Sequence, residues 1–179
     1  MIRAVVMGAA LALAGCASPV VTRIDAVRPA ALPASASFAI LDAPGEMAPV
    51  QRQAIDTVVQ SLVGRGWSQS ETGDFLLAVT VSERPAKAQL VAGDDFGRPA
   101  GVIVPAASRS NNKGCAKRDQ RLTVTLANRA TGDVLYAGAA SEFHCKAAID
   151  KNLPELVSAA LTGMDGTPGV RQVERAGVR

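Results

Sequence analysis

Beyond the N-terminal segment of this 179-residue sequence, the side chains with the clearest potential for chemistry are two cysteines and the single histidine. Cys115, His144 and Cys145 supply two thiols and an imidazole, which can bind zinc or, without a metal, form a disulfide. A structural zinc site needs a fourth ligand, and adjacent residues of a strand point to opposite faces, which separates His144 from Cys145. We therefore expect no metal site and no cofactor.

The sequence contains no motif of a known catalytic site. It lacks G-x-S-x-G, a phosphate-binding loop, a dinucleotide fingerprint and H-E-x-x-H. A serine triad needs a histidine, and His144 stands beside a cysteine that we expect to be bonded. Asp94 and Asp95 adjoin in a glycine-rich segment, as solvated turn residues do, and the further ligands that calcium needs are not spaced around them. We expect no catalytic residues and no enzyme activity.

The N-terminus combines a short positive start, an apolar stretch and a cysteine. Arg3 precedes the apolar Ala4–Ala12, which is too short to span a bilayer, and Leu13-Ala14-Gly15-Cys16 follows. These four residues resemble the lipobox of bacterial lipoproteins, in which the cysteine is acylated and becomes the mature N-terminus. The resemblance implies a signal peptide over residues 1–15, cleavage between Gly15 and Cys16, and lipidation of Cys16. An ordinary secretory signal that contains a cysteine is the alternative.

The residues after Cys16 indicate the membrane in which the protein resides, and the composition indicates which kinds of partner it binds. Ala17 stands where, by analogy with lipoprotein sorting, an aspartate would retain the protein in the inner membrane. We expect the outer membrane, periplasmic side, with the N-terminal lipid as the anchor. Lys and Arg total 19 against 16 Asp and Glu, and aromatic residues make up 3% of the chain. This weak, scattered positive charge predicts no nucleic-acid partner.

Residues 16–35 are predicted to be the lipidated N-terminus and a flexible tether. Pro19, Pro29 and Pro33 interrupt this segment, and it has no sustained helical or strand period. The alternation over Val20–Val27 leaves an edge strand open as the second interpretation. Either way, the segment would space a folded domain from a lipid surface.

Residues 36–166 are predicted to form a single domain, and residues 167–179 a disordered tail. The strands and helices of this domain are predicted from apolar residues that recur with periods of two and of about 3.6 residues. They are strands at 35–41, 74–83, 121–128 and 133–143, a helix at 49–63, and a second helix at 147–164 whose start could lie near Asn152. Between them, residues 84–119 form a long loop, which is functional or disordered. Its apolar island, Val102–Val104, could be a strand that pairs with an edge of the hairpin formed by 121–128 and 133–143, or a place where a partner adds to the sheet.

The strands at 121–128 and 133–143 are predicted to form a hairpin around Arg129–Gly132. A register centred on Ala130 pairs Leu126 with Val134 and keeps the apolar residues on one side. Extending the same register outward brings Cys115 opposite Cys145. We therefore predict a Cys115–Cys145 disulfide, which an oxidising periplasm permits, with two unpaired thiols as the alternative.

The order of these elements resembles the domain of unknown function 4136 lipoproteins. The resemblance rests on the lipobox and on fold-level patterns over roughly Val20–Gly166: the strand with Phe38, the helix ending Leu62-Val63-Gly64-Arg65-Gly66-Trp67, the strand Asp74-Phe75-Leu76-Leu77-Ala78-Val79, the hairpin from Leu122 to Gly138, and the terminal helix. It implies an α+β fold in which an antiparallel sheet of about four to five strands carries two α-helices on one face. It also implies an envelope lipoprotein whose biochemical role is unassigned.

Two functions from different classes fit this sequence. The first is a non-catalytic interaction or structural module of the cell envelope, which binds an envelope protein through an open sheet edge or the long loop. The second is a small-ligand or lipid-binding accessory of an envelope transport system, with the apolar island as part of a cleft. An apolar pocket between sheet and loop would favour the second.

The predicted disulfide can be tested by intact mass under non-reducing conditions. We expect Cys115 and Cys145 to resist alkylation until a reductant is added, because the bond removes both thiols. Loss of a bond that closes this loop would lower the free energy of unfolding by about 3 to 4 kcal/mol. Two alkylatable thiols outside Cys16 in the unreduced protein would contradict the pairing.

Overall fold

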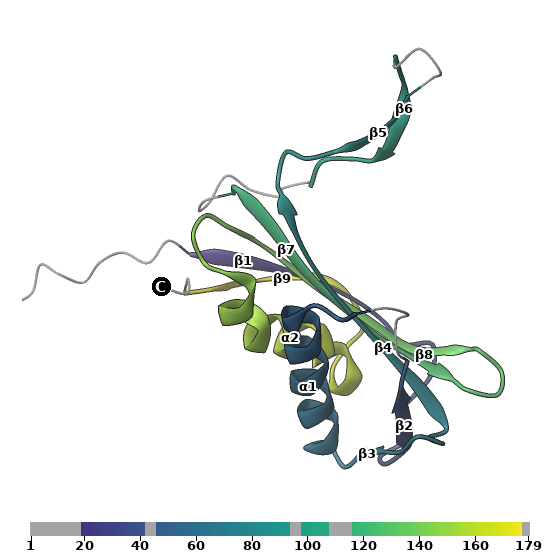
Figure 1. The fold of residues 1–179 in the computed structure, drawn as a ribbon. Coiled ribbons are helices and arrows are strands. Elements are labelled where there is room, and N and C mark those ends of the chain that lie inside the picture. The colour runs from purple at the N-terminus through teal and green to yellow at the C-terminus, as the bar shows by residue number, and fades with distance from the viewer. Residues whose placement is uncertain (1–18, 42–45, 94–97, 108–115, 177–179) are drawn as a thin grey trace, which may run out of the picture.

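The chain forms an α+β fold in which one large sheet carries two helices (Figure 1). The computed structural model describes residues 19–41, 46–93, 98–107 and 116–176. The helices are α1 (Pro49–Val63) and α2 (Ile149–Asp165). The strands are β1 (Val20–Val27), β2 (Ser37–Ile40), β3 (Ser68–Gln69), β4 (Phe75–Pro85), β5 (Leu90–Gly93), β6 (Pro99–Val104), β7 (Arg118–Asn128), β8 (Val134–His144) and β9 (Gly169–Arg175).

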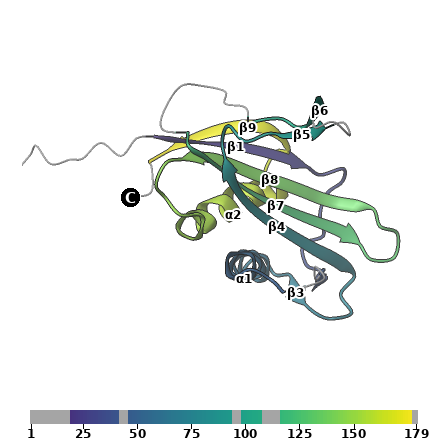
Figure 2. The same cartoon turned by 45° about the horizontal axis from the view of Figure 1, so that its top comes forward.

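The large sheet has seven strands in the order β3-β2-β4-β7-β8-β1-β9, and β5 pairs with β6 in a separate sheet. The α+β class is confirmed, whereas the expectation of four to five strands was too low. β2 runs parallel to β3 and β4, and the other neighbouring pairs are antiparallel. Both helices lie on the same side of the sheet (Figures 1 and 2). Since side chains alternate along a strand, every second residue of β7 and β8 faces them.

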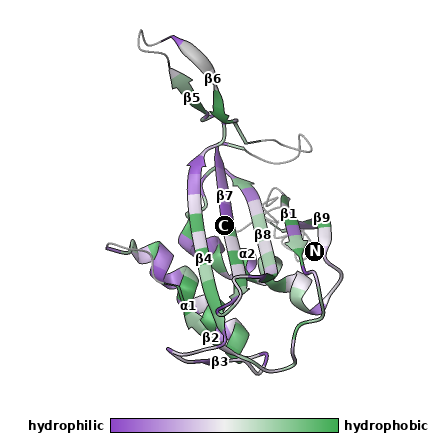
Figure 3. Cartoon of the chain, turned by 90° about the vertical axis from the view of Figure 1, so that its right-hand side faces the viewer, coloured by the Kyte–Doolittle hydropathy of each residue, from purple (hydrophilic) through white to green (hydrophobic). Residues whose placement is uncertain are grey.

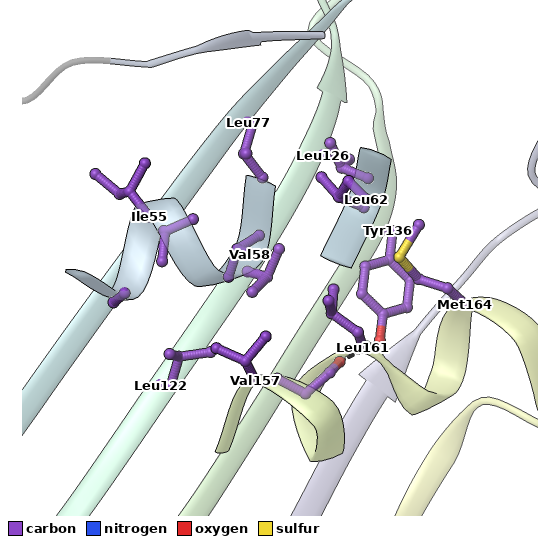
Figure 4. Packing of buried hydrophobic residues seen from close by; sticks show 14 of the residues in the cluster. Ile55, Val58, Leu62, Leu77, Leu122, Leu126, Tyr136, Val157, Leu161 and Met164 are labelled. Atoms are coloured by element: carbon purple, nitrogen blue, oxygen red, sulfur yellow. Dashed lines mark hydrogen bonds between the residues drawn. The ribbon is translucent and has the colours of Figure 1, made fainter. Parts of the chain in front are cut away.

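The hydrophobic core lies between this sheet face and the two helices (Figure 4). The helix predicted at 49–63 is confirmed, and its buried side chains recur at helical spacing: Ala54, Ile55, Val58 and Leu62. Leu122, Val124 and Leu126 of β7 are completely buried in the same cluster. Burying a large aliphatic side chain contributes about 1.5 to 3 kcal/mol, so these layers supply much of the driving force for folding.

Glycine allows α2 to lie unusually close to β8. The Tyr136 hydroxyl donates a hydrogen bond to the Ala160 carbonyl, and burial raises the pKa of Tyr136 to about 12. A Cβ atom at Gly138 would lie 2.5 Å from the Tyr136 hydroxyl and closer still to the Ala160 oxygen. A Cβ atom at Gly163 would lie 3.2 Å from that hydroxyl. The two glycines therefore make room for a tyrosine between helix and strand.

The predicted tether is wrong over Val20–Val27, because β1 lies inside the large sheet. It pairs with β8 on one side and β9 on the other, so it is not an edge strand either. Val20, Thr22, Ile24 and Ala26 are buried and the residues between them are more exposed. The alternation was the informative signal, and the nearby prolines lie outside the strand.

The predicted disordered tail is also wrong over Gly169–Arg175. This segment forms β9, which pairs antiparallel with β1 from Val20–Arg175 to Ala26–Gly169. Most of its side chains are exposed. Backbone pairing and Arg175 hold it in place, and neither leaves an apolar pattern in the sequence.

The predicted long loop over residues 84–119 contains strands. β4 extends to Pro85, β7 begins at Arg118, and β5 and β6 form a hairpin between them. We call residues 90–93 and 99–104 the arm. It extends beyond the end of the large sheet, with hydrophobic stretches in both strands (Figures 1 and 3). The apolar island Val102–Val104 is a strand, but its partner is β5 and not the predicted hairpin.

The β7–β8 hairpin is present with a register two residues from the predicted one. Leu126 pairs with Tyr136 instead of Val134, and an irregularity follows at Ala127. The Asn128 side chain accepts hydrogen bonds from the amides of Ala130 and Thr131, at 2.9 and 3.0 Å. This Asx-type turn lengthens the connection, which moves the strands past each other.

Replacing Gly138 with alanine tests the close approach of α2. The new methyl would meet the Ala160 carbonyl, a backbone atom that cannot rotate away, so we expect Gly138→Ala to destabilise the fold by about 3 kcal/mol in urea unfolding. Gly101→Ala is the matched control, because a Cβ atom there meets nothing within 4 Å. Equal stabilities of the two variants would contradict the packing described.

Candidate functional site

The structure describes only some of the residues that the sequence analysis predicts to form functional sites. Gly15, Cys16 and Cys115 lie outside the described residues, so lipidation, cleavage and the disulfide stay predictions. His144 ends β8 on the buried side, and the half-buried Cys145 follows it. Lys117 lies near this position, since its amide donates to the His144 carbonyl at 3.1 Å. The described register of β7 and β8, with Arg118 opposite His144, is shifted by two residues from the one used to predict the pairing, and it ends before Cys115.

His144 belongs to a buried polar cluster that the sequence analysis missed. We use this name for Thr22, Gln120, Glu142, His144, Asn152 and Arg175. The Glu142 carboxylate is the centre of the cluster: His144 Nε2 lies 2.9 Å and Asn152 Nδ2 2.7 Å from its Oε2. Arg175 donates to both carboxylate oxygens, with Nε at 3.0 Å from Oε1 and Nη2 at 2.5 Å from Oε2.

Five elements meet at this cluster: β1, β7, β8, α2 and β9. The Thr22 hydroxyl of β1 donates to Glu142 Oε1, and Asn152 of α2 donates to Gln120 Oε1 of β7 at 3.1 Å. Gln120 donates in turn to Glu83 Oε2 of β4 at 2.7 Å. Because Gln120, Asn152 and Arg175 each bond to more than one partner, the cluster fixes the relative positions of the strands and α2.

The cluster keeps Glu142 ionised inside the protein. Burial by itself raises its pKa, but the hydrogen bonds from His144, Arg175, Thr22 and Asn152 outweigh burial and lower the pKa to about 2. The Glu142 side chain is 0% exposed, and the Arg175 side chain 18%. The enclosed carboxylate therefore holds together the strands and the helix that supply its hydrogen-bond partners.

A sequence signal for the cluster existed. Tyr136, Gly138, Ala140, Glu142 and His144 all fall on the same face of β8, and the first three are buried. Two ionisable residues continuing a buried face indicate an internal polar site. Within the described ranges, no group of three or more His, Cys, Asp or Glu side chains could hold a metal ion.

The other face of the large sheet carries small side chains at its centre. No described helix covers it (Figure 2). The register forms two rows across three strands, one of Ala78, Thr125 and Ala137 and one of Thr80, Thr123 and Ala139. We call these six residues the flat face. All are at least partly exposed, which offers a partner a smooth surface with hydroxyl groups.

The arm presents apolar side chains to solvent. Leu90, Val102 and Ile103 are 55%, 56% and 61% exposed, and Val104 is 40% exposed. Hydrogen bonds hold its base against the sheet: the Ala86 amide donates to the Lys117 carbonyl at 2.9 Å, and the Ala107 amide to the Ala86 carbonyl at 3.2 Å. The arm is thus fixed at its base and exposed along its strands.

A pocket lies at the base of the arm, between charged and apolar side-chain surfaces. It measures about 340 Å³ and is lined by Glu83, Arg84, Pro85, Lys117 and Arg118. Arg84 is paired with Asp119 at 3.1 Å and Arg118 with Glu83 at 3.0 Å. Neither described helix has the length and hydropathy needed to cross a bilayer.

The carboxylate of Glu142 makes stability depend on pH. Its folded pKa of about 2 lies below the ordinary value of 4.5. The resulting stabilisation, about 3 kcal/mol, is fully present above pH 4.5 and is lost as the pH falls towards 2. We expect Glu142→Gln to lower the free energy of unfolding at neutral pH by a similar amount and to flatten its decline in acid.

Glu155→Gln is the matched control for this measurement, since Glu155 is exposed on α2. It should unfold like the wild type at every pH. Urea unfolding followed at a series of pH values measures both variants. If Glu142→Gln lost stability in acid as steeply as the wild type, another group would be responsible for the fall in the free energy of unfolding at low pH.

Comparison with known proteins supports the fold alone. No family model and no curated protein matches the chain. A PDZ domain protein from Parabacteroides distasonis is similar over 88% of this chain, with a TM-score of 0.54 and 11% identity, and the chain spans 38% of that protein. Two PelC dodecamer structures from Paraburkholderia phytofirmans give TM-scores of 0.48 and 0.49 at 10% identity. The similarity covers 82% and 80% of this chain, and 98% and 96% of the respective PelC chains.

Proposed function

We propose that this protein is a lipid-anchored, non-catalytic interaction module of the bacterial envelope. Lipidation at Cys16, after cleavage behind Gly15, would hold it at the outer membrane on the periplasmic side. Two acyl signals anchor a protein stably, because each buried methylene contributes about 0.8 kcal/mol. We also propose that it is a member of the domain of unknown function 4136 lipoproteins, on the strength of the element order in the sequence.

The absence of catalysis in this proposal is supported by the enclosure of the reactive groups. Glu142 is 1% exposed and His144 5%. Their polar atoms bond to Arg175 and Asn152, and these bonds orient them towards one another and away from solvent. A general base has to reach a substrate proton, and these side chains are turned inward.

The flat face is the observation on which the interaction role depends. Its alanine and threonine side chains are short, so the backbone of a partner can approach the sheet closely. Threonine hydroxyls supply donors and acceptors at the rows' inner positions, Thr123 and Thr125. We propose that another envelope protein packs on this face.

The proposal is tested in intact cells with a chemical crosslinker. We expect one protein to crosslink in stoichiometric amount to the wild type, and Ala139→Arg to abolish that product, since the long charged side chain prevents close packing. Ser158→Arg is the control, because Ser158 is exposed on the opposite side of the molecule, on α2. It should leave the crosslink intact.

Mass spectrometry of the N-terminal peptide accompanies this experiment. We expect it to begin at Cys16 and to carry acyl mass. An unmodified Cys16 would refute the anchor. Co-extraction of a lipid or small molecule in place of a crosslinked protein would refute the interaction role.

A further inference from the structure

The strand register brings the start of β1 and the base of the arm to the same end of the large sheet. β8 contributes His144 at this end, opposite Arg118 of β7, which is in turn opposite Pro85 of β4. β1 runs antiparallel to β8, with Arg23 opposite Ser141, so Val20 lies near the His144 end. The chain therefore enters the sheet on the side from which the arm leaves it.

The length of the N-terminal connection bounds the distance of this end from the membrane. This step rests on the proposed function, in which Cys16 carries the lipid. Four residues lead from Cys16 to Val20. A fully extended chain advances at most about 3.6 Å per residue, so Val20 lies within about 14 Å of the anchored residue. The end of the sheet that bears the arm is thus held beside the lipid surface.

The arm itself has the properties of a membrane-contacting element. β6 has six residues, which extend about 20 Å, comparable with the distance from the anchor. A two-stranded ribbon is marginally stable in water by itself, and this one exposes Leu90, Val102 and Ile103 by more than half. Apolar side chains of this size are favoured at the boundary of headgroups and acyl chains.

Positive charge surrounds the base of the arm. Three arginines here are already paired with carboxylates: Arg84 with Asp119, Arg118 with Glu83, and Arg175 with Glu142. The exposed cations are lysines of the arm base, the start of β7 and the start of α2: Lys87, Lys117, Lys146 and Lys151. Among the described residues at this end they outnumber the remaining acidic side chains, Asp150 and Glu174. Exposed lysines beside apolar side chains complement an anionic lipid surface.

We propose that the arm enters the interfacial layer of the same anionic membrane that carries the lipid anchor, with the surrounding lysines against lipid phosphates. The anchor limits the distance, the arm supplies apolar contact, and the lysines supply the charge. Two contacts at separate points then fix the orientation of the domain. The flat face, which lies along the strands, stands away from the lipid and stays open to a protein.

Tryptophan fluorescence in the full processed protein tests this inference. Ile103→Trp places the reporter on the arm, and Val134→Trp is the matched control, because Val134 is 44% exposed at the opposite end of β8. The wild type, whose Trp67 is 4% exposed, gives the background. Each is reconstituted in vesicles of phosphatidylethanolamine and phosphatidylglycerol with brominated acyl chains, which quench only a tryptophan in contact with them.

We expect strong quenching and a blue-shifted emission for Ile103→Trp, with neither change for Val134→Trp. Equal fluorescence of the two variants would overturn the inference, as would an arm that crosslinks to a protein in cells and remains unquenched. The mass of the Cys16 peptide separates the two proposals. If Cys16 is acylated but the arm tryptophan is not quenched, only the arm contact is refuted. If Cys16 is not acylated, the anchor is refuted. Vesicles added to the unacylated protein then still show whether the arm tryptophan is quenched.

Discussion

The buried carboxylate of Glu142 is the constraint on which the rest of the structure depends. A charge removed from water must be compensated, and the compensating groups come from the two ends of the described chain: Thr22 near its start and Arg175 near its end. Asn152 adds the last helix to the same site. One anion therefore joins β1, β8, β9 and α2, while the apolar core positions both helices on the sheet.

The core and the polar cluster divide the sheet into two parts. Around α1, large aliphatic side chains such as Val58 and Leu62 fill the space between helix and strands. Around α2, glycine at positions 138 and 163 brings helix and strand together over Tyr136. The polar cluster lies towards the other end of α2, at Asn152, and core side chains such as Leu156 fill the space between.

Elements with a strong apolar period were predictable from the sequence, and elements stabilised by pairing alone were not. α1 and the strands of the β7–β8 hairpin were found because their core residues recur at regular spacing. β9 was missed because a single side chain, Arg175, and the backbone of β1 hold it. The hairpin register was missed because the Asn128 side chain adds residues to the turn. The polar cluster was missed because its members lie far apart in sequence and meet only through the topology.

The place of β1 in the sheet has a consequence for the timing of folding. Synthesis proceeds from the N-terminus, but both neighbours of β1 come from the second half of the chain, residues 134–144 and 169–175. Until β9 has been synthesised, Val20–Val27 has an open backbone edge and Glu142 lacks its arginine. Pairings this distant in sequence form late and slowly. The nascent protein therefore stays incompletely folded until residues 169–175 have been synthesised and can pair with β1.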